Sequence, residues 1–318
     1  MTTYKEIFGK YVRSVGSDPS AAVGEGEIWY NTSSNTFKTS IGVGAWSAGG
    51  NLGTARYSLA GMGTQTAGLA VGGNNPGANA VVEEYNGSTW SEVNNIPTAT
   101  LNIRGFGIQT SAVVAGGGPV GATASYEYDG TNWSGGGTMG TSRNYGGTNG
   151  TLTAGLYAAG YNGSNMTNTE EYDGTSWTAG GSVNTARRGG QSGGTQTAAV
   201  FMTGFVGPTS PNYGSMTEEY DGSSWTSVNS ATTGRLGGMG GGALQTAGFI
   251  AGGSNPTTAA AEHYDGTNWS TVASIATARY NGTGAGTQTS GLIFGGIGPN
   301  AQTEEYSVVS TVQTLTTS

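Results

Sequence analysis

A unit of about 44 residues recurs six times along the chain, and this repeat constrains the fold more than any other feature. Each copy has a Thr-x-Arg opening or a near copy of it, a glycine-rich run, a Thr-Gln-Thr turn or a near copy of it, a short apolar segment and a Glu-Tyr-Asp-Gly-x-x-Trp segment or a variant of it. Six tryptophans mark the period, at steps of 44, 43, 44, 48 and 44 residues: Trp46, Trp90, Trp133, Trp177, Trp225 and Trp269. A unit of this length cannot bury its apolar face alone and must stack on its neighbours. The period therefore predicts one β-propeller blade per unit.

Four antiparallel strands are expected from each unit. In the first copy they begin at Thr54, at Ala67, at Val82 and at the tryptophan that follows the tight turn. The glycine-dense first strands are expected where inner strands converge on the axis. Because the last copy ends at Tyr306 without a following tryptophan, the segment around Trp46 is predicted to close the ring as the outer strand of the last blade. The fold class is thus an all-β, six-bladed propeller; the alternative is a seventh, irregular blade built from an N-terminal hairpin.

The segment before the repeats is expected to be a separate element. Residues 1 to about 24 read as an irregular or partly helical arm, and a hairpin follows at 27–39 around a polar turn. We therefore divide the chain into residues 1–40 and a propeller at 41–318. The sequence has no signal-peptide pattern and no run of about 18 apolar residues, so we expect synthesis in a cytoplasm and no membrane insertion.

Composition excludes several kinds of chemistry. The 318 residues include no cysteine, so neither disulfides nor thiolate metal sites are available. The formal charge is −8 and the few basic residues do not cluster, which argues against nucleic-acid binding. No cofactor is expected, and glycines at fixed places in a period that also carries aromatic residues argue against disorder.

Charged residues recur in register with the repeat, and we interpret them as structural. The arginine of the opening and the glutamate two before the tyrosine are predicted to pair: Arg56, Arg143, Arg187, Arg235 and Arg279 with Glu83, Glu170, Glu218, Glu262 and Glu304. A ligand-binding ring is the alternative. A second series lies on the opposite face of the same strands: Glu84, Glu127, Glu171, Glu219 and Glu305, with His263 as a tolerated substitution. Because catalysis by paired carboxylates needs two distinct environments, this repetition favours structure over a glycosidase.

The aspartates before the turn glycines are predicted to cap backbone amides in the tight turns: Asp129, Asp173, Asp221 and Asp265, with Asn86 in the first copy. Calcium binding is the alternative, but one carboxylate per turn is few for a hard cation. With a single histidine and no nucleophile-elbow motif, a Ser-His-Asp triad has no support. We therefore assign no catalytic residue and no metal ligand.

The loops between second and third strands vary, whereas the turns at the other face are uniform, so the variable face is the predicted contact surface. The longest of these loops contains Phe205 and Tyr213. The candidate binding residues on this face are Asn74, Asn75, Tyr161, Asn162, Phe205, Tyr213, Asn255 and Asn300.

Two resemblances add to this interpretation. The diglycine after the second strand, the tyrosine and the outer tryptophan make residues 46–306 resemble a kelch-type propeller. The opening MTTYKEIFGK, Ser17-Asp18-Pro19 and GEIWYN up to Phe37-Lys38 resemble the N-terminal segment of virion structural proteins of marine tailed bacteriophages, especially cyanophages. This second resemblance implies a particle component that docks through its N-terminal segment; the candidate docking residues are Tyr4, Ile7, Phe8, Trp29, Tyr30 and Phe37.

Two functions follow as hypotheses. The favoured one is a non-enzymatic virion structural protein, on a tail, fibre or capsid, assembled in the host cytoplasm. Its N-terminal segment would bind other virion proteins, and its propeller would contact host-surface glycan, another virion protein or a symmetry mate. Many displayed copies, or a homo-oligomer, would multiply weak contacts. The alternative is a glycan-cleaving propeller enzyme, similar to sialidases or glycosidases, that uses carboxylates of the ring.

Overall fold

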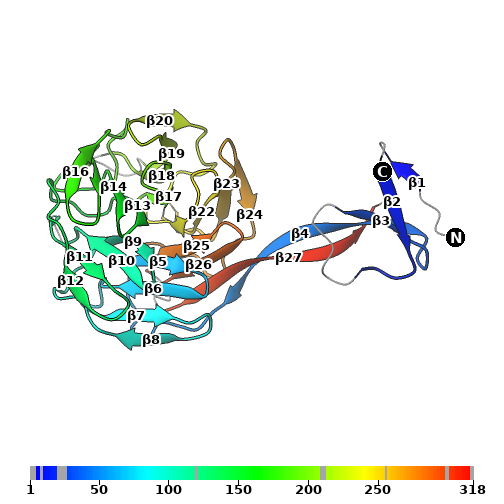
Figure 1. Ribbon diagram of the computed structural model, residues 1–318, viewed down its shortest axis with the longest axis horizontal. Helices are drawn as coiled ribbons and strands as arrows, with labels where there is room; N and C mark the ends of the chain where they lie inside the picture. The colour runs from blue at the N-terminus through cyan, green and yellow to red at the C-terminus, as the bar shows by residue number, and fades with distance from the viewer. Residues whose placement is uncertain are drawn as a thin grey trace. The chain divides into compact units, whose positions relative to one another are not determined.

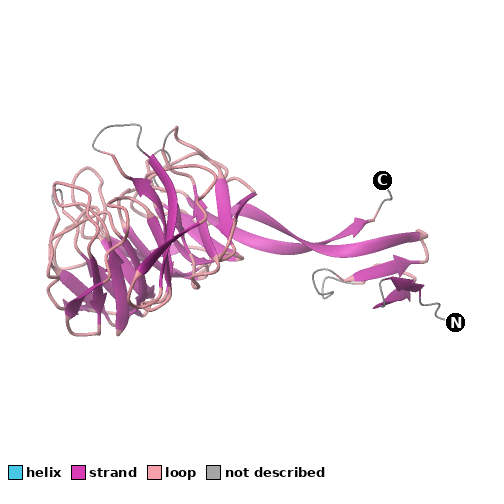
Figure 2. Cartoon of the chain, turned by 90° about the horizontal axis from the view of Figure 1, so that it is seen from above, coloured by secondary structure: helices cyan, strands magenta, loops and turns pink. Residues whose placement is uncertain are grey.

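The structure, a computed structural model, describes residues 5–7, 10–19, 27–118, 121–207, 213–254, 256–297 and 301–315. Within these ranges the regular elements are all β-strands, as Figure 2 shows. No helix in this part of the chain is long and apolar enough to cross a membrane. The chain divides into two compact units, which we call the N-terminal unit (Met1–Ala45 with Ser307–Ser318) and the propeller (Trp46–Tyr306).

Six sheets surround a common axis in the propeller (Figure 1). Five of them are four-stranded antiparallel meanders of consecutive strands. Blade 1 contains β5 (Ala60–Thr64), β6 (Ala67–Val71), β7 (Val82–Tyr85) and β8 (Trp90–Val93). Blade 2 contains β9 (Arg104–Ile108), β10 (Ser111–Ala115), β11 (Ser125–Tyr128) and β12 (Trp133–Gly135). Blade 3 contains β13 (Gly147–Thr151), β14 (Ala154–Ala158), β15 (Thr169–Tyr172) and β16 (Trp177–Gly180). Blade 4 contains β17 (Gln191–Gly194), β18 (Ala199–Phe205), β19 (Tyr213–Tyr220) and β20 (Trp225–Val228). Blade 5 contains β21 (Met239–Gly241), β22 (Gly248–Ala251), β23 (Ala261–Tyr264) and β24 (Trp269–Val272).

Blade 6 joins the two ends of the repeat region, as the missing final tryptophan predicted. Its strands are β25 (Thr283–Thr287), β26 (Ser290–Phe294), β27 (Thr303–Thr314) and β4 (Thr36–Ala48), in that order. Trp46 lies in β4, its ring 5.1 Å from that of Tyr306 on β27. A strand from before the first repeat thus completes the last blade, and the count of blades is six. Closure of this kind leaves no end blade, and the inner edges of the sheets are short strands that face the axis.

The first strands begin later than the sequence indicated. Thr54, Ala55 and Arg56 precede β5, which starts only at Ala60. The physical reason is that Arg56 turns inward to a buried ion pair, while Ser58 adopts a left-handed backbone conformation with φ of 55°. Both features interrupt an extended chain.

Glycine in the inner strands allows the blades to approach closely, as expected. A Cβ atom added at Gly61 would lie 2.4 Å from a side-chain carbon of Thr283 in blade 6. The second strands are buried on both faces, for example Ala112, Val113 and Val114 at 0% exposure. Each outer tryptophan packs on the tyrosine of the adjacent strand, as in the stacked rings of Tyr128 and Trp133 at 4.7 Å. The apolar core therefore lies within and between blades.

The N-terminal unit corrects two sequence-based interpretations. The arm is not helical in its described residues, because β1 (Lys5–Ile7) and β2 (Lys10–Val15) form an antiparallel pair there. The predicted hairpin is confirmed as β3 (Ile28–Asn31) and the start of β4, and β2 pairs with β3 in parallel. Residues 307–318, which we had assigned to the propeller, belong to this unit because β27 continues beside β4; the Leu315 amide donates to the Phe37 carbonyl at 2.8 Å.

Candidate functional site

The five predicted arginine–glutamate pairs all form, each within one blade, and each is buried. In blade 1 the guanidinium of Arg56 donates to Glu83 and to the Ala70 carbonyl. The same carboxylate accepts from the backbone amides of Gly53 at 2.6 Å and Thr54 at 3.2 Å. Each pair therefore ties the third strand to the segment that enters the blade. These groups hold the blade together, as the structural interpretation of the sequence proposed.

Blade 2 lacks both partners of this pair at once. Thr100 stands in the arginine position and Tyr126 in the glutamate position, and the Tyr126 hydroxyl is 2.9 Å from the Thr98 hydroxyl. Breaking a buried ion pair by removing one partner leaves an uncompensated charge, whereas replacing both does not. Blade 2 is thus a natural double replacement within the same ring.

The second glutamate series bonds between blades. Each carboxylate accepts a hydrogen bond from the tyrosine hydroxyl of the next blade: Tyr128 to Glu84, Tyr172 to Glu127, Tyr220 to Glu171, Tyr264 to Glu219, and Tyr85 to Glu305. Burial and the bonded carboxylate raise the pKa of Tyr85 to about 12. At the sixth junction His263 takes the glutamate's place, with its ring 5.0 Å from that of Tyr306, and burial lowers the pKa of His263 to about 4. The repeated carboxylates therefore occupy one equivalent structural setting.

The turn aspartates cap backbone amides, as predicted. The Asp129 carboxylate accepts from the amides of Thr131 at 2.8 Å and Asn132 at 2.7 Å, and these bonds lower its pKa. Asn86 makes the corresponding bonds in blade 1. Among the described residues, no group of three or more histidine, aspartate or glutamate side chains is placed to hold a metal ion.

Sequence reasoning missed the role of the glutamine in the Thr-Gln-Thr turn. In five blades its amide nitrogen reaches the preceding blade and donates to two backbone carbonyls there. Gln196, for example, donates to the carbonyls of Gly155 at 3.0 Å and Tyr172 at 2.9 Å. Its recurrence in five of the six copies, with Leu152 in the third, was the available signal. The turn therefore joins the first two strands of its blade and also holds that blade to the preceding one.

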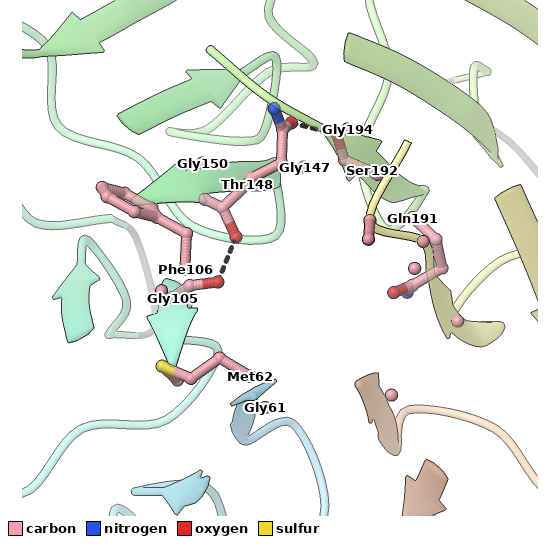
Figure 3. A pocket seen from close by; sticks show the side chains of 18 of the residues that line it. Gly61, Met62, Gly105, Phe106, Gly147, Thr148, Gly150, Gln191, Ser192 and Gly194 are labelled. Atoms are coloured by element: carbon pink, nitrogen blue, oxygen red, sulfur yellow. Dashed lines mark hydrogen bonds between the residues drawn. The ribbon is translucent and has the colours of Figure 1, made fainter. Parts of the chain in front are cut away.

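A channel of about 320 Å³ runs between the six inner strands (Figure 3). Half of its lining residues are glycine, with Met62 and Phe106 among the apolar ones and Thr148, Asn149 and Gln191 among the polar ones. Thr148 donates to the Gly105 carbonyl at 2.8 Å, and the Gln191 amide is directed into the opening (Figure 3). No carboxylate is among the lining residues, and Arg104 is the charged residue among them.

A closed ring of backbone hydrogen bonds surrounds one mouth of this channel. The second residue before each inner strand has a positive φ. Its backbone amide donates to the carbonyl of the equivalent residue in the preceding blade. The six members are Ser58, Asn102, Tyr145, Gly189, Gly237 and Asn281, with N···O distances of 2.6 to 3.4 Å. The bond from Ser58 to Asn281, at 2.6 Å, spans the junction of blades 1 and 6. The backbone itself therefore closes the circle.

The predicted contact residues do not all lie where a partner could reach them. Asn75 and Asn162 are exposed, and Asn74, Tyr161 and Tyr213 are partly buried. Phe205 is only 7% exposed, because it belongs to β18 and packs against Tyr213 at 5.7 Å, so it is a framework residue of this face. Asn255 and Asn300 lie outside the described residues.

Sequence reasoning also missed Arg188, which contacts aromatic residues of the variable face. We call this face, formed by the loops between the second and third strands, the loop face. Its guanidinium lies 4.3 Å from the ring centre of Tyr161 and 4.6 Å from that of Phe205. It also donates to the Asn165 side chain at 3.0 Å. The doubled arginine, which occurs in the fourth copy alone, was the signal. Tyr161, Asn165 and Arg188 thus form a preorganised polar and aromatic cluster.

The proposed docking residues are only partly accessible. Trp29 is 2% exposed, and its indole donates to Asp18 at 3.1 Å. Tyr30 and Phe37 pack together at 5.1 Å. Ile7 lies in β1, while Tyr4 and Phe8 lie outside the described residues. Other apolar side chains of this unit are exposed: Ile28, Val43, Val308, Val309, Val312 and Leu315.

The fold defines the class of protein, a six-bladed β-propeller with an N-terminal unit. No family model and no curated protein sequence matches the chain. Among solved structures it is similar to YjhT, with a TM-score of 0.64 and 12% sequence identity over 84% of this chain and 100% of that one. A likeness at this identity shows the fold alone.

Proposed function

We propose that the protein is a non-enzymatic virion structural protein of a tailed phage, attached through its N-terminal unit and displaying the propeller for binding. One observation carries the non-enzymatic part. The recurring arginine, glutamate and aspartate side chains bond to groups of the fold itself, within a blade, between blades or in a turn. A carboxylate bonded in this way stabilises the ring, whereas a catalytic pair needs two groups in different settings.

The attachment role is supported by the surface of the N-terminal unit. Of the eight exposed large apolar side chains among the described residues, six belong to this unit, although it is much the smaller of the two. Val309, at 60%, is the most exposed of the eight. A concentration of exposed apolar side chains in so small a unit favours an interaction role for it. Together with the resemblance of the opening segment, this favours burial of the unit against other virion proteins during assembly in the host cytoplasm.

The binding role falls to the loop face. Its variable loops carry neutral amide side chains, such as Asn75 and Asn162, around the cluster of Tyr161, Asn165 and Arg188. Aromatic rings with adjacent amide and guanidinium donors suit the apolar faces and hydroxyls of a host-surface glycan. Display in many copies, or as a homo-oligomer, multiplies weak contacts of this kind into useful avidity.

A matched pair of substitutions tests the attachment. Val309 in the N-terminal unit and Leu244 in the propeller are 60% and 59% exposed. We expect Val309→Asp to abolish incorporation of the full chain into particles and Leu244→Asp to leave it unchanged, with equal thermal midpoints for both. Normal incorporation of Val309→Asp would remove the basis for the docking unit. A change of oligomeric state in Val309→Asp without loss of incorporation would assign the surface to self-association instead. Hydrolysis of a host-surface oligosaccharide by the pure protein would contradict the non-enzymatic role.

A further inference from the structure

We propose that the central channel binds a small oxyanion at the guanidinium of Arg104. The ligand class is a carboxylate, phosphate or sulfate group small enough to enter the ring. Arg104 pairs with Ala115, where the second strand of blade 2 ends, so the site lies at the loop-face end of the channel. It does not depend on the proposed function.

Arg104 is held at the wall of the channel with donors to spare. It is the first residue of β9, its Nε donates to the Gly146 carbonyl at 3.0 Å, and its guanidinium lies 5.6 Å from the ring centre of Tyr145. Within the described ranges, no carboxylate forms an ion pair with it and no protein group accepts from Nη1 or Nη2. Two terminal nitrogens of a planar guanidinium match the two oxygens of a carboxylate or the edge of a phosphate.

Arg104 differs from the recurring buried arginines of the ring, which are all paired. The five arginines of the repeat each have a buried glutamate partner. Where blade 2 loses that arginine, at Thr100, it also loses the glutamate, at Tyr126. The chain thus pairs its repeated buried charges or removes them together. Arg104 does not follow this pattern. Burial disfavours its charged form and lowers its pKa, so a counter-ion from outside the chain would stabilise the charged guanidinium.

The surroundings suit a small anion. The channel volume, about 320 Å³, falls at the lower end of the roughly 300–1,000 Å³ of small-molecule sites. Gln191 occupies the position in β17 that Arg104 occupies in β9, and its amide end is directed into the opening as a second donor (Figure 3). The intervening position in blade 3 is Gly147, which adds no side chain. No carboxylate of the lining would repel the ligand.

Tyr145 gives the mouth beside Arg104 a special geometry. It has a φ of 56°, which is strained for a bulky residue, whereas its equivalents in the other blades are serine, asparagine or glycine. Its hydroxyl lies 3.3 Å from that of Ser58, two blades away. Strain of this kind persists only where the surrounding structure imposes it, and it is concentrated at functional sites. Tyr145 therefore places an aromatic ring against the guanidinium at the entrance.

The test uses the full-length protein at pH 7 and constant ionic strength, titrated separately with sodium acetate, sodium phosphate and sodium sulfate against sodium chloride. We expect at least one of the three anions to raise the thermal midpoint saturably, on the order of 2–4 °C, because a ligand that binds the folded state stabilises it. The acetate arm and the phosphate and sulfate arms distinguish a carboxylate from a tetrahedral oxyanion.

Arg104→Gln should weaken this binding at least 10-fold, whereas the control Arg13→Gln, which alters an exposed arginine of β2 in the N-terminal unit, should leave it unchanged. Crystals of the unaltered protein soaked in the stabilising anion provide a second measurement that does not depend on a variant. Density within hydrogen-bonding distance of Arg104 would support the site. The proposal is overturned by the absence of any shift beyond that of chloride, by equal binding to Arg104→Gln, or by density only elsewhere.

Discussion

Breaking one buried ion pair should cost far more than replacing both of its partners. In blade 3 the Arg143 side chain is 0% exposed and bonds to Glu170 and to the Asn168 carbonyl at 2.7 Å. Glu170 also accepts from the Gly140 amide at 2.6 Å. Glu170→Gln would leave the guanidinium buried without its counter-charge, so we expect a loss of about 3–5 kcal/mol in the free energy of unfolding. This is a large share of the roughly 5–15 kcal/mol typical of a folded protein.

The double replacement Arg143→Thr with Glu170→Tyr copies the arrangement that blade 2 already uses. We expect it to cost much less than the sum of its two single replacements, by about 2 kcal/mol or more in a double-mutant cycle. Urea unfolding measures the free energy of unfolding of each variant, provided that its slope against urea concentration stays constant. The reasoning is refuted if Glu170→Gln costs less than about 1 kcal/mol, or if the double replacement costs as much as the two single ones together.

Three further predictions concern the junctions between blades. Tyr220→Phe removes the hydroxyl that donates to Glu171 at 2.6 Å and should lower the free energy of unfolding by about 1–2 kcal/mol; an unchanged urea midpoint would contradict this. Gln196→Ala removes two hydrogen bonds to blade 3 and should lower the free energy of unfolding by about 1–2 kcal/mol. Gln191→Ala, which removes an amide directed into the channel, should lower it less. The reverse order would show that Gln196 does not hold the two blades together. The pKa of His263 is lowered to about 4, below its unfolded value of about 6.5. The contribution of its neutral imidazole to the free energy of unfolding is therefore present above pH 6.5 and lost as pH falls towards 4. We expect about 1–2 kcal/mol after allowing for partial exposure, and His263→Gln should flatten this part of the pH profile; identical profiles for the two proteins would disprove the assignment.

The features that recur were predictable from the sequence, because repetition marks a residue whose setting is the same in every blade. The third strand of blade 1 begins at Val82, as predicted, since the alternating pattern and the turn that follows leave little freedom. The pairing of Arg56 with Glu83 and the closing role of Trp46 followed from the same regularity.

Features that occur once, or that depend on a distant partner, were not predictable. Arg104 carries no repeat signal, and its position at the channel follows only from the register of β9. The parallel pairing of β2 with β3 was not predicted, because it joins strands across an intervening segment and no local pattern encodes such pairing. Phe205 was taken for a loop residue, but a longer hairpin between β18 and β19 buries it. In each case tertiary contacts decided the outcome.

The central claim is that the six blades form a closed ring whose first and last blades are joined. Amide hydrogen exchange at two equivalent positions tests it most directly. The Ser58 amide bonds across the junction of blades 1 and 6, and the Gly189 amide bonds across the junction of blades 3 and 4. A closed ring predicts comparable protection for both amides, because no junction is an end. Rapid exchange at Ser58 with slow exchange at Gly189 would reveal an open stack with fraying end blades and would contradict the account.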